Sequence, residues 1–179
     1  MEKPKERASL VLLKNKEGQY CLARKKQAIH HLGGDIPYSL GMYNAYGGKF
    51  ESPDETIVDT TLRELHVESS VVGLKEGLTL NCRVYFYTKK EDGTFQPYMD
   101  VSFFTLTTWE GDPKESSEMG PPEWFLGPNF PFYEMMPADK FLFQKIFEGV
   151  DGVYEVKLQV KKTPPEIRVL NEPLVNALL

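Results

Sequence analysis

The feature that most constrains the fold of this chain is a glycine pair followed by a short acidic loop and a charged helical segment, GGKFESPDETIVDTTLRELHVESS, over residues 47–70. Two adjacent glycines lack Cβ atoms, so their backbone can approach a ligand or another segment closely. A simple β-turn is the alternative use of such a pair. Ser52 or Asp54 is expected to cap the helix, and Pro53 is tolerated in its first turn. This unit is therefore expected to bring backbone atoms close to the carboxylates of an acidic helix.

Two glutamates of this helix are expected to lie beside its apolar face. At 100° per residue, one arc of roughly 140° collects the positions Ile57, Val58, Thr61, Leu62 and Leu65. Glu64 and Glu68 fall at roughly 340° and 20° when Ile57 is at 0°, at the edge of that arc. Asp59 and Arg63, on the other flank, are expected to form a solvated salt bridge. The glutamate pair is either a site for a hard divalent cation, whose ligands are oxygen atoms, or an ordinary pair that reaches water or lysines.

Strand patterns surround this unit. ASLVLLKN (8–15) is an apolar run typical of a buried strand, and YCLARKK (20–26) is expected to pair with it as a hairpin. Residues 27–43 contain several glycines and a proline, and they predict a long surface loop of the kind that often binds ligands. The segments 78–90 and 96–109 flank EDGT, an Asp-Gly turn signal, and predict a second hairpin.

The C-terminal part predicts an amphipathic helix over 137–149, closed by Gly149, and a final strand over 152–162. The tail from Thr163 is weakly patterned, and no element is assigned to residues 163–179. Strands before and after each of two helices indicate a mixed sheet covered by helices, either α/β or α+β. Nothing in the sequence indicates a second domain, so residues 1–179 are expected to form one domain with a core over about 8–160.

Composition narrows the function classes. The chain has 179 residues, of which 41% are hydrophobic, and a formal net charge of −5. The acidic balance argues against a protein that clamps a nucleic-acid polymer, but a nucleotide remains possible as ligand where a divalent metal supplies positive charge. Cys21 and Cys82 are expected to be buried free thiols, as in a reducing compartment. No apolar run approaches the roughly 18 residues of a membrane span. A cytoplasmic monomer that does not bind membranes is expected.

The stretch 47–70 resembles the Nudix box, G-x5-E-x7-R-E-U-x-E-E-x-G-U, in which U is a bulky aliphatic residue. Glu55, followed after seven residues by Arg63, Glu64 and Leu65, matches its central part, and Glu68 matches the second acid of the E-E pair. The sequence departs from the box in three ways. Val67 stands at the first acid, Ser70 stands at the glycine, and the loop before Glu55 has one extra residue.

Stretches outside the box are similar to the oxidised-purine nucleoside triphosphate diphosphatases, the Nudix subfamily that hydrolyses 8-oxo-dGTP. They are RKKQ, YNAYGGK, MDVSFFTLTTWEGDPKESSEMGPPEWF and PFYEMMPADKF, within residues 8–160. The resemblance implies a Nudix α/β/α sandwich with a mixed sheet. It also implies that water attacks a phosphorus atom of a nucleoside triphosphate and releases the monophosphate and pyrophosphate, with Mg²⁺ as cofactor and Mn²⁺ as an alternative.

The resemblance also assigns roles to residues near the phosphates. The metal ligands that it implies are Glu64, Glu68, Glu118 and the carbonyl of Gly47. Arg63 and Glu55 are implied to orient the helix against its loop through a salt bridge, and with Glu64 and Glu68 they form the implied catalytic set.

Base recognition is implied for a second group of residues. Asn44 and Asp139 match polar contacts to the purine edge, and Lys25 matches a lysine at the pocket entrance. The side chains implied to line the pocket are Met99, Met119, Met136, Tyr85 and Tyr87. Simpler roles stay open for some of them: Met99 as a core residue, Asp139 as a helix cap and Lys25 as a solvated lysine.

Two departures bear on the substrate. Ala138 stands where the subfamily has the first of two acids that read the oxidised base, and Met136 stands where it has a stacking tryptophan. We therefore weigh three hypotheses: a metal-dependent nucleoside triphosphate diphosphatase, a Nudix-fold nucleotide-binding protein with weak turnover, and a Nudix hydrolase of another diphosphate-linked compound. Convergence of Glu64, Glu68 and Glu118 would separate the first from the second.

Overall fold

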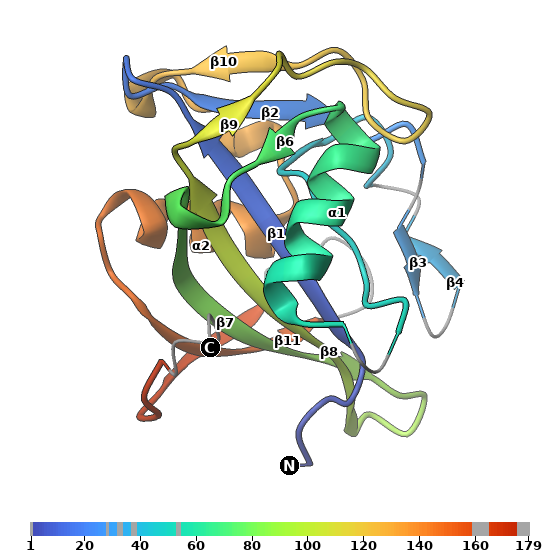
Figure 1. The fold of residues 1–179 in the computed structure, drawn as a ribbon. Coiled ribbons are helices and arrows are strands. Elements are labelled where there is room, and N and C mark those ends of the chain that lie inside the picture. The colour runs from blue at the N-terminus through green and yellow to red at the C-terminus, as the bar shows by residue number, and fades with distance from the viewer. Residues whose placement is uncertain are drawn as a thin grey trace.

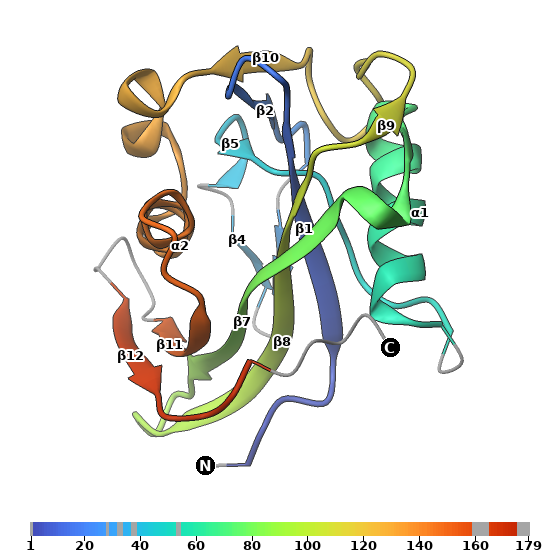
Figure 2. The same cartoon turned by 60° about the vertical axis from the view of Figure 1, so that its left-hand side comes forward.

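A mixed β-sheet between two helices organises the chain. The computed structural model describes residues 2–27, 29–31, 34–36, 39–52, 55–158 and 165–174. Helix α1 (Ile57–Ser69) covers one face of the sheet and helix α2 (Pro137–Phe147) the other (Figure 1; Figure 2). The α/β/α sandwich that the resemblance implies is therefore confirmed.

The strands of the main sheet follow the order β10-β2-β1-β8-β7-β11-β12, with β5 beside β2. Their bounds are β1 Arg7–Lys14, β2 Tyr20–Arg24, β5 Tyr43–Asn44, β7 Leu78–Lys89, β8 Phe95–Leu106, β10 Glu123–Phe125, β11 Gly152–Leu158 and β12 Glu166–Leu170. The pairs β1–β8 and β7–β11 are parallel, and the other pairs are antiparallel. Two small ladders join β3 (Ile29–His31) to β4 (Gly34–Ile36) and β6 (Val72–Gly73) to β9 (Trp109–Glu110).

Strand β1 is buried on both faces because α1 packs against one face of the sheet and α2 against the other. Val11 and Leu13 pack in the cluster under α1, whereas Leu12 packs in the cluster under α2, with Leu10 against it. Alternate residues of a strand point to opposite faces, so a central strand between two helices needs apolar residues at successive positions. This requirement explains the uninterrupted apolar run VLL at its centre.

Several predicted elements are confirmed, and two of the predictions about loops and strands are wrong. The hairpins β1–β2 and β7–β8 and helix α2 lie where the sequence predicts them. Residues 27–43 are not all loop, because they contain the β3–β4 ladder. The strand that begins at Gly152 is not the last one, because β12 pairs with it from within the unassigned tail. Both cysteines are free and buried, as expected.

Helix α1 begins later than predicted. Its N-cap is Thr56, whose side chain accepts a hydrogen bond from the Asp59 amide while the Asp59 carboxylate accepts one from the Thr56 amide. This capping box replaces the expected cap at Ser52, and the alternative at Asp54 falls, with Pro53, outside the described residues. Because Asp59 serves the cap, the expected Asp59–Arg63 salt bridge is also wrong.

The helix ends at a strained residue. Ser70, its C-cap, has φ 63° and ψ 9°, in the left-handed region, and its amide donates to the His66 carbonyl at 2.8 Å. Within the described part of the chain it is the one residue other than glycine with positive φ. The left-handed conformation costs residues with a Cβ atom roughly 1 kcal/mol, which is why glycine is common there.

Among the described helices, none is long and apolar enough to span a membrane.

We expect Ser70→Gly to raise the free energy of unfolding by roughly 0.5–1 kcal/mol, because glycine adopts this conformation without steric cost. Chemical denaturation measures the change. Ser69→Gly, one residue earlier, is the matched control. Ser69 is helical, and its hydroxyl donates to the Leu65 carbonyl, so this variant is expected to lose stability. A destabilised Ser70→Gly variant would contradict the prediction.

Candidate active site

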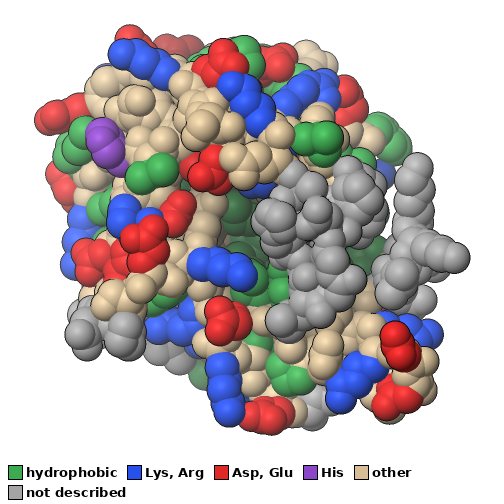
Figure 3. Space-filling view, turned by 90° about the vertical axis from the view of Figure 1, so that its right-hand side faces the viewer, with side chains coloured by type: hydrophobic (Ala, Val, Ile, Leu, Met, Phe, Trp, Pro, Cys, Tyr) green, Lys and Arg blue, Asp and Glu red, His purple; other side chains and the backbone are tan. Residues whose placement is uncertain are grey.

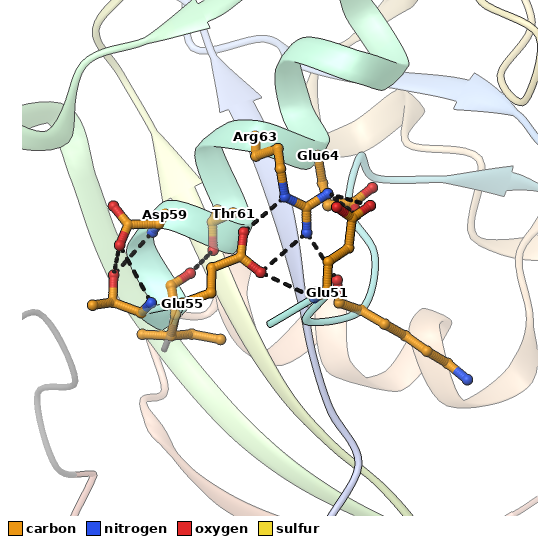
Figure 4. Close-up of polar contacts among 9 residues, drawn as sticks. Glu51, Glu55, Asp59, Thr61, Arg63 and Glu64 are labelled. Atoms are coloured by element: carbon orange, nitrogen blue, oxygen red, sulfur yellow. Dashed lines mark hydrogen bonds and ion pairs between the residues drawn. The ribbon is translucent and has the colours of Figure 1, made fainter. Parts of the chain in front are cut away.

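Arg63 joins helix α1 to the loop before it (Figure 4). Its Nε donates to Glu55 Oε1 at 2.7 Å and its Nη2 to Glu55 Oε2 at 3.2 Å. Its Nη1 donates to Glu64 Oε1 at 2.6 Å and lies 3.2 Å from Glu51 Oε1, and Nη2 also reaches the Lys49 carbonyl at 3.0 Å. Hydrogen bonds from the Arg63 guanidinium lower the pKa of Glu55 to about 2. The guanidinium thus fixes Glu64 and the loop in one arrangement.

The two glycines allow close packing that a side chain would prevent. A Cβ atom on Gly47 would lie 2.0 Å from the Ser9 carbonyl oxygen, and one on Gly48 would lie 2.5 Å from the Glu64 carboxylate. Gly47 has φ 150°, and its amide donates a hydrogen bond to Glu68 Oε2 at 2.6 Å. The pair is therefore more than a simple turn, because it lets the backbone fit between strand β1 and the two glutamates of α1.

Glu68 is a buried carboxyl group beside two others. Only 2% of the residue is exposed, and burial raises the pKa of Glu68 to about 7. The Lys25 charge and the Gly47 amide oppose this rise, whereas the charges of Glu64 and Glu118 add to it. The expected partial desolvation of the pair is thus confirmed, and completely so at Glu68. Such a group is a functional candidate with a physical cause.

The loop that carries Glu118 is fastened to the end of strand β2. The Lys26 amide donates to the Glu118 carbonyl at 2.8 Å, and the Lys26 ammonium donates to the Ser116 carbonyl at 2.7 Å. Lys25 and Met119 form an isolated antiparallel bridge next to these contacts. Sequence reasoning missed Lys26, and its place beside Lys25 in RKKQ is the signal that would have suggested it.

The oxygen donors suit a hard divalent cation such as Mg²⁺ or Mn²⁺. Glu64 and Glu68 come from one helix, and the charge of Glu118 reaches Glu68 from a distant loop. In the part of the chain that the structure describes, however, no three His, Cys, Asp or Glu side chains are grouped as a metal site. Val67, at the position of the missing acid, is 56% exposed and supplies no donor. The donor chemistry fits a metal ion, and the grouping is looser than the resemblance implies.

Asp139 is a second buried carboxyl group near Lys25. It is 8% exposed, burial raises its pKa to about 7, and the Lys25 charge opposes the rise. Asp139 is not the N-cap of α2, because Met136 occupies that position and the cap has no side-chain hydrogen bond. Lys25 therefore acts electrostatically on both Asp139 and Glu68, and its Nζ lies 4.0 Å from Met119 Sδ. The reading of Lys25 as a lysine in contact only with water does not fit this position.

Asn44 lies in strand β5, paired with Ala23 of β2. It is 5% exposed, and its Oδ1 accepts a hydrogen bond from the Ala45 amide at 2.8 Å. Ala23 lies two residues before Lys25, so Asn44 pairs with the same end of β2 that leads into Lys25.

The expected pocket residues divide among different clusters. Met99 and Ala138 are buried in the cluster under α2, whereas Met119 is fully buried in the cluster under α1. Met136 is also buried, 8% exposed. The position that lacks the first base-reading acid is thus packed as an apolar residue, and the core reading of Met99 fits its place.

Tyr85 and Tyr87 lie in a third cluster with Val153, where the Lys3 ammonium donates to the Tyr85 hydroxyl at 3.3 Å. Strand alternation explains this position, because the intervening Phe86 points to the cluster that contains Met99. This placement does not support the two tyrosines as walls of the pocket that would contain Met99.

The face on the right-hand side of Figure 1 is hollowed. Figure 3 shows hydrophobic side chains inside the hollow and Lys, Arg, Asp and Glu side chains around it. An apolar recess with charged groups at its margin is the usual form of a small-molecule site.

No model of a known protein family matches this chain. Among similar proteins, two are named oxidized purine nucleoside triphosphate hydrolase. The protein from Danio rerio is 32% identical over 132 residues, which are 68% of this chain and 80% of the relative. The protein from Mus musculus is 32% identical over 128 residues, which are 70% of this chain and 76% of the relative.

Solved structures show the same fold. A MutT protein from Bacillus halodurans has a TM-score of 0.73 at 21% identity, covering 94% of this chain and 99% of that one. A MutT Nudix hydrolase from Burkholderia pseudomallei has a TM-score of 0.60 at 17% identity, covering 81% and 99%. The Nudix domain of Shewanella oneidensis NrtR, solved with ADP ribose, has a TM-score of 0.56 at 14% identity, covering 83% and 89%.

Asp139 is expected to make stability depend on pH. Its folded pKa, about 7, lies above its ordinary value of 3.8, so its contribution is fully present below pH 3.8 and is lost as pH rises to about 7. The loss is at most about 4 kcal/mol. Asp139→Asn does not titrate, so its free energy of unfolding relative to wild type should increase between pH 4.5 and 8. Chemical denaturation at both pH values measures this, and a constant difference would contradict the prediction.

Proposed function

Because the chain belongs to the Nudix hydrolase family, we propose that it hydrolyses a purine nucleoside triphosphate with an oxidised base, such as 8-oxo-dGTP, to the monophosphate and pyrophosphate in a metal-dependent reaction. The relatives named oxidized purine nucleoside triphosphate hydrolase, at 32% identity, support the substrate class. The observation that carries the proposal is the buried carboxyl group of Glu68, which the Gly47 amide holds next to Glu64.

The phosphate end of the proposed site is acidic, so it needs a cation before it can accept a triphosphate. A bound Mg²⁺ or Mn²⁺ would neutralise phosphate charge and help to activate a water molecule. We propose Glu64, Glu68, Glu118 and the Gly47 carbonyl as its ligands. Arg63 holds the Glu64 carboxylate through Nη1, and the Glu55 carboxylate fixes the same guanidinium from the loop. Arg63 and Glu55 would therefore hold helix α1, which carries the proposed ligands Glu64 and Glu68, in a fixed position relative to the loop.

The base end of the proposed site uses groups that both donate and accept hydrogen bonds. Asn44 has an amide, and Asp139, with a pKa raised by burial to about 7, can carry a proton near neutral pH. A protonated carboxyl group can donate to a purine edge, and an ionised one can only accept. Met99 and Met136 are proposed as the apolar lining, and Lys25 as the cation between the two ends. Met119, fully buried in the cluster under α1, is proposed only as the contact of Lys25.

A second candidate is a nucleotide-binding protein with weak turnover. Val67 favours it, because an exposed valine replaces a carboxylate on the metal-facing helix. Hydrolysis of another diphosphate-linked compound is the third hypothesis, and substrate profiling separates it from the first. A cytoplasmic monomer remains a prediction from the sequence.

Pyrophosphate release should be measured with dGTP, 8-oxo-dGTP, dATP and 2-oxo-dATP, with and without Mg²⁺. We expect release that requires the metal and has a higher kcat/KM for an oxidised purine than for its normal counterpart. Binding without release would favour the second candidate. Neither binding nor release with any of the four would contradict the proposed substrate class.

Two variants test the proposed roles at the phosphate end. Glu68→Gln keeps the shape and removes a ligand charge, so we expect kcat to fall by more than about 100-fold. Arg63→Ala removes an outer partner of a ligand, which typically costs about 10- to 100-fold. Glu148→Gln is a matched control, because Glu148 forms an exposed ion pair with Lys145 at the end of α2. Turnover of Glu68→Gln equal to that of the control would refute the assignment.

A further inference from the structure

Arg24, the last residue of strand β2, contacts two segments that lie far apart in the sequence. Its Nη1 donates to the Gly41 carbonyl at 2.8 Å, and its Nη2 donates to Glu134 Oε2 at 2.5 Å. Its guanidinium carbon also lies 3.9 Å from the centre of the Tyr43 ring, in a cation–π contact. One planar side chain thus makes three contacts, using its nitrogen donors and its flat face.

The first of these segments leads into Asn44. Gly41 has φ 75°, and its amide donates to the Lys25 carbonyl at 2.8 Å, so the turn is closed on the residue after Arg24. Tyr43, on which the guanidinium lies, directly precedes Asn44 and pairs with Arg24 in the β2–β5 ladder. The Tyr43 hydroxyl donates to Glu123 Oε1 at 2.8 Å, which fixes the ring from its other end.

The second segment leads into Asp139. Glu134 ends the 3-10 turn Phe132–Glu134, two residues before Met136 and three before the first residue of α2. The neighbouring Tyr133 is 91% exposed, and the Lys140 ammonium lies 4.0 Å from the centre of its ring. The 3-10 turn before α2 is therefore connected to strand β2 by Arg24 and to the first turn of α2 by Lys140.

The pairing of Arg24 with Glu134 is partly exposed, with 41% and 57% of the two side chains accessible. Exposed ion pairs contribute little to global stability. Their geometric effect is larger when one side chain fixes the relative position of two segments, as Arg24 does here.

We propose that Arg24 is a positioning residue of the base pocket, which sets the separation between Asn44 and Asp139 and thereby the affinity for the purine. The inference rests on the proposed function, because it needs a base that these two residues read. Arg24 lies at the β5–α2 end of the site and makes none of the contacts described for Glu64 or Glu68, so it should act on substrate binding and not on the hydrolytic step.

Steady-state kinetics with the preferred triphosphate of the panel test this role. We expect Arg24→Ala to raise KM by roughly threefold to tenfold, the range that a partly exposed ion pair and a cation–π contact can supply, with kcat changed by less than about twofold. Arg24→Lys keeps the charge but loses the planar fork, so it should restore KM only in part. Glu134→Gln should raise KM less than Arg24→Ala and add nothing to it in the double variant. Glu148→Gln is again the control.

Amide hydrogen exchange of the ligand-free protein gives a second readout. Arg24→Ala should speed exchange in residues 41–44 and 135–139 and leave helix α1 unchanged. Unchanged KM in an active Arg24→Ala variant would overturn this inference alone, as would faster exchange spread over the whole chain. If the wild type neither binds nor cleaves any triphosphate of the panel, the proposed function falls and this inference with it, so the two failures are distinguishable.

Discussion

Glu68 carries a carboxyl group into a position where 2% of the residue is exposed, with the Gly47 amide as hydrogen-bond donor. The local structure depends on this contact. The amide can reach the carboxylate only if Gly47 lies against the Ser9 carbonyl of strand β1, where no Cβ atom fits. Helix α1 must then keep its phase, because a change of one residue would rotate Glu68 by about 100°. Arg63 and Glu55 hold that phase from the loop.

The parts of the fold that local chemistry determines could be predicted from the sequence. Glycine spacing, the apolar arc of α1 and the Asp-Gly turn of the β7–β8 hairpin act within a few residues of each other, and these elements form as predicted. The cap at Thr56 could not be chosen over Ser52, because several residues in the loop are competent N-caps and tertiary contacts select one. Strand β12 has weak strand patterning, and it becomes visible only through its pairing with β11.

The candidate site divides in the same way. Burial of Glu68 followed from the helix phase, whereas the positions of Tyr85 and Tyr87 depended on which face of strand β7 each residue occupies. A one-residue change of register reverses the faces, and β7 has irregular pairing at two places. The two departures in the helix also differ physically. Ser70 keeps the left-handed geometry at a cost in stability, whereas Val67 is exposed and changes the charge of the site without changing its fold.

Two buried carboxyl groups with pKa values near 7 lower the stability of the ligand-free protein. Glu68 and Asp139 each lose solvation on folding, and the charge of Lys25 offsets only part of the resulting rise in their pKa values. Stability alone would favour uncharged residues of similar size at both positions. Keeping ionisable groups there is reasonable when a ligand supplies what the fold lacks: positive charge at the Glu68 end and hydrogen-bonding partners at the Asp139 end. A triphosphate that arrives with its cation carries both, so one ligand would relieve both ends of the site together.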